Sequence, residues 1–76
     1  MGGMTLLACL ATYRRGEELY LYGTYPCIVT RDTFIGIEDA PMVPVTNILA
    51  FGQSDEQDYT DYVRATDLSF FKLPNL

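Results

Sequence analysis

The chain has 76 residues, which is enough for one domain with a single hydrophobic core. Apolar residues make up 49% of the chain and charged residues 20%, which is typical of a globular rather than a disordered protein. Ten acidic residues against five basic ones give a net charge of −5, so nucleic acid is not the partner that we expect. A basic peptide or protein is favoured instead, because opposite potentials steer encounter.

Apolar stretches and cysteines indicate the compartment. The sequence has no run of about 20 apolar residues, so we expect no membrane partner. The apolar stretch from Met4 to Ala11 is too short, and lacks the preceding basic residues, for a signal peptide. We interpret residues 1–3 as a leader and predict one domain over 4–76. Two cysteines, Cys9 and Cys27, are too few for a disulfide framework, so we expect both thiols buried on neighbouring strands of an intracellular protein.

Short apolar and β-branched segments separated by turn residues predict strands. In chain order these segments are 5–13, 19–22, 25–30, 34–38, 43–51 and 59–65. Pro44 places the beginning of 43–51 at a sheet edge, and 52–58 is a polar, acidic loop. Residues 66–68 predict a short C-terminal helical turn. We therefore expect an all-β fold: a small five-stranded, closed or nearly closed barrel of the SH3-like or Tudor-like kind.

Residues for catalysis are missing from the sequence. The chain has no His and only two serines, Ser54 and Ser69, so it offers neither a serine triad nor a histidine acid–base pair. It has no glycine-rich phosphate loop, and the acidic residues of 55–61 lack the order of a calcium loop. We expect no enzyme, no cofactor and no metal site.

One string of residues resembles a known signature. Leu21 to Val29 (LYGTYPCIV) is similar to the motif of PWWP domains, which belong to the Tudor-like superfamily of chromatin readers. The strings ILAFG at 48–52, YV at 62–63 and LSFF at 68–71 follow in the order and approximate spacing of that family. The resemblance covers residues 22–71 and implies a five-stranded barrel.

The resemblance also implies a ligand site. In this family an aromatic cage holds a methylated ammonium group by cation–π attraction, which contributes about 0.5 to 2 kcal/mol per ring. Carried over by position, the cage consists of Tyr22, Tyr25 and Phe51, with Asp55 or Glu56 as acidic support. The partner would be the methyl-lysine of a histone tail, which implies a nuclear location.

Two other functions fit the same residues. A small SH3-like adaptor of viral or bacterial origin would bind a partner protein through its aromatic surface, without methyl-lysine specificity. An acidic decoy of nucleic acid would use the loop 55–61. Convergence of Tyr22, Tyr25 and Phe51 on one open pocket is the feature that distinguishes the cage from the adaptor.

Overall fold

The protein is described by a computed structural model over residues 13–74. The all-β class is confirmed, since regular structure in this range consists of six strands and three short 3₁₀ turns. The strands are β1 (Glu18–Leu21), β2 (Tyr25–Val29), β3 (Phe34–Ile35), β4 (Pro41–Thr46), β5 (Asp61–Arg64) and β6 (Leu68–Ser69). The 3₁₀ turns are η1 (Ile37–Asp39), η2 (Glu56–Tyr59) and η3 (Ala65–Asp67). Of the strand predicted at 5–13, residues 5–12 lie outside the described range.

None of the helical turns in the described residues is long or apolar enough to cross a membrane.

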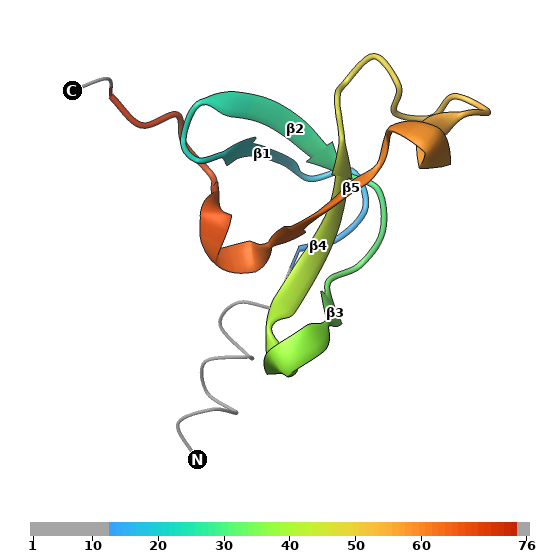
Figure 1. Ribbon diagram of the computed structural model, residues 1–76. Helices are drawn as coiled ribbons and strands as arrows, with labels where there is room; N and C mark the ends of the chain where they lie inside the picture. Colours follow the sequence, from blue (N-terminus) through green and yellow to red (C-terminus); the bar gives the residue numbers. More distant parts are fainter. Residues whose placement is uncertain (1–12, 75–76) are drawn as a thin grey trace.

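The strands form one antiparallel sheet with β4 at its centre. Its order is β3-β4-β2-β1-β6, and β5 pairs with the other edge of β4. Figure 1 shows β4 running through the middle of the molecule, with the β1–β2 hairpin on one side and β3 near its lower end. One edge of β4 thus serves two partners, β3 through Pro41 and Met42 and β2 through Val45 and Thr46.

The sheet is open, which corrects the prediction of a closed five-stranded barrel. There are six strands, and within residues 13–74 no ladder joins β5 to β6. The chain instead passes from β5 to β6 through η3, where the Leu68 N–H donates to the Ala65 carbonyl. The carbonyl of Asp67 in the same turn accepts a hydrogen bond from the Tyr22 N–H at 2.8 Å. The predicted helical turn at 66–68 corresponds to η3, one residue earlier.

Pro44 lies inside β4 and is buried, contrary to the expected edge position. It is opposite Tyr62 of β5, and its carbonyl accepts hydrogen bonds from the Thr30 N–H at 2.9 Å and the Thr30 hydroxyl at 3.3 Å. Proline supplies no N–H donor. It therefore fits the point where one edge of β4 changes partner from β3 to β2, because the ladders on that edge skip residue 44.

The strand β4 ends at Thr46, five residues before the predicted end of 43–51. The side-chain oxygen of Asn47 accepts a hydrogen bond from the Ala50 N–H at 2.9 Å, which closes a turn. Asparagine favours such turns because its side chain replaces a backbone acceptor. The apolar residues of 48–51 are therefore in a loop, and Ile48 and Leu49 are exposed.

The core lies on the inner face of the curved sheet. Alternating residues of β1, β2 and β4 contribute to it, and the C-terminal residues of β2 and β4 are buried on both faces of the sheet. The buried cluster consists of Tyr13, Leu19, Cys27, Val29, Val43, Val45, Ala65 and Leu68. Cys27 is buried as predicted; its thiol donates to the Leu19 carbonyl at 3.5 Å, and burial raises its pKa. Cys9, the other half of that prediction, lies outside the described residues.

The β1–β2 turn gives a test of local packing. Gly23 has a φ of +70°, and a Cβ placed there would lie 2.5 Å from the Leu73 side chain. Gly16 also has a positive φ, +95°, but no atom within 4 Å of such a Cβ. We expect Gly16→Ala to lower the free energy of unfolding by about 1 kcal/mol from backbone strain. Gly23→Ala should lower it further in urea titrations, because Leu73 must also move. Equal losses would show that Leu73 makes no effective contact with the turn.

Candidate functional site

The three predicted cage residues lie in different surroundings. Tyr22 and Tyr25 are at the two ends of the β1–β2 turn, and both are exposed. Tyr22 borders a hollow formed with η3, β6 and Leu73, whereas Tyr25 lines a separate one between β2, β4 and β5. Phe51 lines neither of these hollows. The three aromatic rings therefore share no hollow.

The face of Phe51 is covered by an arginine. The guanidinium carbon of Arg15 lies 4.4 Å from the centre of the Phe51 ring, within cation–π range. The same guanidinium donates two hydrogen bonds to Glu56, at 2.8 and 3.0 Å, and one to the Thr30 carbonyl at 2.9 Å. We call Arg15, Phe51 and Glu56 the arginine clamp. It fastens the loop after β4 to the end of β2.

Glu56, one of the two predicted acidic supports, is occupied by the clamp. Its carboxylate also accepts the Gly52 N–H at 2.8 Å, which closes the loop from 52 to 56. The hydrogen bonds from Arg15, followed by the one from Gly52, lower the pKa of Glu56 below its ordinary value. The hydrogen bonds between Arg15 and Glu56 also raise the pKa of Arg15 above its ordinary value. Glu56 is therefore a structural carboxylate of the loop.

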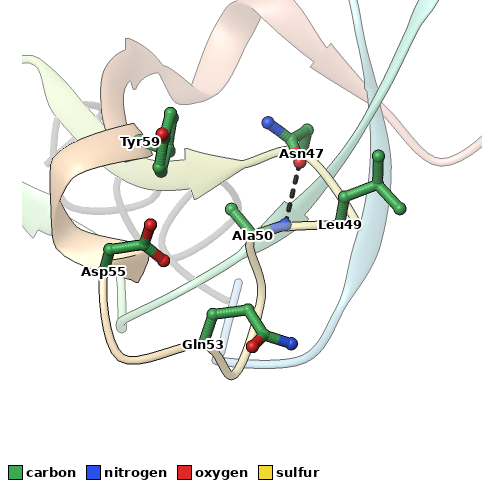
Figure 2. A pocket seen from close by; sticks show the side chains of 6 residues that line it. All are labelled: Asn47, Leu49, Ala50, Gln53, Asp55 and Tyr59. Atoms are coloured by element: carbon green, nitrogen blue, oxygen red, sulfur yellow. Dashed lines mark hydrogen bonds between the residues drawn. The ribbon is translucent and has the colours of Figure 1, made fainter.

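Asp55, the other predicted acidic residue, borders a hollow of about 400 Å³. This loop hollow is lined by Asn47, Leu49, Ala50, Gln53, Asp55 and Tyr59. Figure 2 shows Asp55 and Tyr59 on the side of η2, with Asn47 and Leu49 across from them and Gln53 at one end. Figure 2 also shows the hydrogen bond that closes the turn from Asn47 to Ala50.

A second hollow of about 200 Å³ adjoins the first, since both are lined by Asn47 and Tyr59. This strand hollow contains the exposed rings of Tyr25 and Tyr59 together with Asp61. Its remaining lining residues are Leu21, Pro26, Cys27, Val45 and Thr46. We call the two hollows together the acidic groove. Neither Asp55 nor Asp61 forms an ion pair within residues 13–74.

Tyr59 borders both hollows, and two hydrogen bonds fix the backbone at and beside it. The hydroxyl of Thr46 donates to the Tyr59 carbonyl at 3.0 Å, and the hydroxyl of Thr60 donates to the Glu56 carbonyl at 3.0 Å. Sequence reasoning placed Tyr59 at the start of a strand and missed it as a site residue. The available signal was an aromatic residue at the end of an acidic loop.

Two further hollows lie beside β3 and share the ring of Phe34. Their charged lining residues are Arg31, Asp32 and Arg64, so they carry both signs of charge. The acidic groove is different, because the charged residues that line it within 13–74 are Asp55 and Asp61.

The groove offers recognition chemistry. Two tyrosine rings beside a carboxylate suit a cationic side chain, which gains cation–π and Coulomb attraction together. Across the described residues, no group of three or more His, Cys, Asp or Glu side chains is placed to hold a metal ion. The fold and the groove thus define a small antiparallel β domain with an acidic, aromatic surface groove. Comparison with known proteins finds no matching family model, curated protein or solved structure.

Proposed function

We propose that this protein is a non-catalytic module that binds a basic peptide or protein segment in the acidic groove. A lysine or arginine side chain enters the strand hollow between Tyr25 and Tyr59, with its charge beside Asp61. The observation that carries the proposal is one hollow lined by two exposed tyrosines and by Asp61, which forms no ion pair within residues 13–74. The net charge of −5 adds a longer-range attraction for such a partner.

We also propose that the sheet is related to SH3-like or Tudor-like barrels and is open between β5 and β6. The strand order β5-β4-β2-β1-β6 supports it, because η3 then links the two end strands through the chain itself. The predicted likeness to PWWP domains rests on the sequence motif around Tyr22 and Tyr25 and stays a prediction.

Binding without strict methyl-lysine specificity is the better supported of the two alternatives. Arg15 covers the face of Phe51, and Tyr22 borders a different hollow from Tyr25. A methylated ammonium would still fit between Tyr25 and Tyr59, since cation–π attraction does not require N–H donors. A histone tail is one partner with this chemistry, and such a partner would imply a nuclear location.

Paired tyrosine variants test the proposal. Tyr22 and Tyr25 are 63% and 62% exposed, so replacing either with leucine disturbs the fold to a similar extent. We expect Tyr25→Leu and Tyr59→Leu each to weaken binding by about 1 to 2 kcal/mol, roughly five- to thirtyfold. Tyr22→Leu should have little effect. The measurement is fluorescence anisotropy with a labelled synthetic peptide in which Lys alternates with Ala, and with its trimethyl-lysine counterpart.

The outcomes separate the hypotheses. Equal losses from Tyr22→Leu and Tyr25→Leu, together with a strong preference for the trimethylated peptide, would restore the originally predicted cage. No saturable binding of either peptide to the unmodified protein would overturn the proposed function. Melting curves for each variant identify any loss that comes from unfolding.

A further inference from the structure

The two hollows of the acidic groove differ in size and lining. The strand hollow, about 200 Å³, is bordered by two tyrosine rings and Asp61. The loop hollow, about 400 Å³, is bordered by one tyrosine ring, Asp55 and the side-chain amides of Asn47 and Gln53. Tyr59 and Asn47 border both, so the two hollows are neighbours.

Each hollow has its own uncompensated carboxylate. Asp55 and Asp61 are both exposed, lie on opposite sides of Tyr59 in the chain, and form no ion pair within residues 13–74. Of the two carboxylates between them in the chain, Glu56 pairs with Arg15 in the clamp and Asp58 lines neither hollow. The groove therefore presents two separate negative charges, one in each hollow.

We infer that the acidic groove reads two basic side chains at alternate positions of one extended peptide, a lysine in the strand hollow and an arginine in the loop hollow. This inference rests on the proposed function and specifies its ligand. Side chains two residues apart in an extended chain point to the same side and are about 7 Å apart. This spacing allows one side chain on each side of the Tyr59 ring.

Size and chemistry assign the two side chains. An ammonium group is a compact charge, and the smaller hollow surrounds it with two ring faces and the carboxylate of Asp61. A guanidinium group is larger and planar, and it pairs with a carboxylate through two parallel hydrogen bonds while stacking on a ring. The loop hollow provides both partners in Asp55 and Tyr59, and the amide oxygen of Gln53 is a further acceptor at its end.

The test combines three labelled peptides with three variants of the full chain. The first peptide carries Lys-Ala-Arg within an alanine and glycine background, and the other two replace either the Lys or the Arg with Ala. The variants are Asp55→Asn, Asp61→Asn and, as a control, Asp58→Asn. Asp58 is an exposed acid of η2 that lines neither hollow, and its substitution changes the net charge by the same amount.

We expect Asp55→Asn to weaken the peptides that contain Arg by about three- to tenfold, and to weaken the Lys-only peptide no more than the control substitution Asp58→Asn does. Asp61→Asn should show the reverse pattern, and Asp58→Asn should weaken every peptide slightly and equally. If all three variants weaken every peptide equally, the groove acts only as a diffuse negative field, and the two-residue inference fails while the proposed function stands. If none of the peptides binds the unmodified protein, the proposed function itself fails.

Discussion

Leu19→Ala is expected to lower the free energy of unfolding by about 2 to 5 kcal/mol, the range for truncating a buried leucine side chain to alanine. Leu19 is 1% exposed, belongs to the core cluster and pairs with Cys27 across the β1–β2 ladder. The alanine leaves a cavity that the surrounding strands fill only in part. A domain of this size has few kcal/mol in reserve, so its melting temperature should fall by roughly 10 °C or more.

Leu49→Ala is the matched control, because it removes the same atoms from a side chain that is 88% exposed. Its effect on stability should stay within about 0.5 kcal/mol. Urea titrations of both variants measure the two losses, and the slope of the transition should be the same as for the unmodified protein. Similar midpoints for Leu19→Ala and Leu49→Ala would contradict the core described above.

Acid should detach the loop that forms the larger hollow. The pKa of Glu56 is lowered in the folded chain, chiefly by its hydrogen bonds with Arg15. A carboxyl group of this kind stabilises the folded state above its unfolded pKa, about 4.3 for Glu, and this contribution is lost as the pH falls through the folded pKa. The clamp is therefore complete at neutral pH and opens only in acid, below the ordinary pKa of a glutamate. Glu56→Gln should abolish this acid-dependent change.

Amide hydrogen exchange at Gly52 reports on the clamp, since its N–H donates to Glu56. We expect faster exchange of this amide in Glu56→Gln at neutral pH, while core amides of β2 and β4 keep their protection. Glu38→Gln is the control, because Glu38 is an exposed glutamate of η1 that forms no ion pair within the described residues. Unchanged exchange at Gly52 in Glu56→Gln would show that the loop is held by other contacts.

The direction in which Arg15→Ala changes the affinity for a basic peptide tests the role of the clamp. Replacing Arg15 with alanine makes the protein more negative, so electrostatics alone would strengthen the binding of a basic peptide. Arg15, however, holds the loop that carries Asp55. Loss of the loop's position should outweigh the added charge, and Arg15→Ala should bind the Lys-Ala-Arg peptide more weakly.

Local patterns predicted much of the sheet. The segment 19–22 overlaps β1, and the segments 25–30 and 59–65 contain β2 and β5, because apolar alternation and flanking turn residues act over a few positions. The segment 43–51 was too long because the Asn47 turn ends β4, and asparagine in an apolar run was given too little weight. Closure of the sheet depends on how β5 and β6 meet, which is a property of the whole chain.

The candidate site was predicted only in part. Tyr25 and Asp55 line the acidic groove, but Tyr22 and Phe51 do not. The cause is a long-range contact, since Arg15 reaches Glu56 across 41 positions of sequence and covers Phe51. No local motif encodes that contact. Tyr59 lines the same hollow as Tyr25 because β4 pairs with both β2 and β5. These pairings also join segments that are distant in sequence.

The pairing of β1 with both β2 and β6 has a consequence for how the chain folds as it is made. Tyr20 is opposite Ser69, so the second ladder of β1 cannot form until almost the whole described chain has left the ribosome. Ala65 and Leu68 also complete the core from this late segment. Contacts so distant in sequence carry a high loop-closure entropy and form slowly. The nascent chain is therefore expected to expose the apolar residues of β1, β2 and β4 until β6 has been synthesised, and to acquire a stable fold only then.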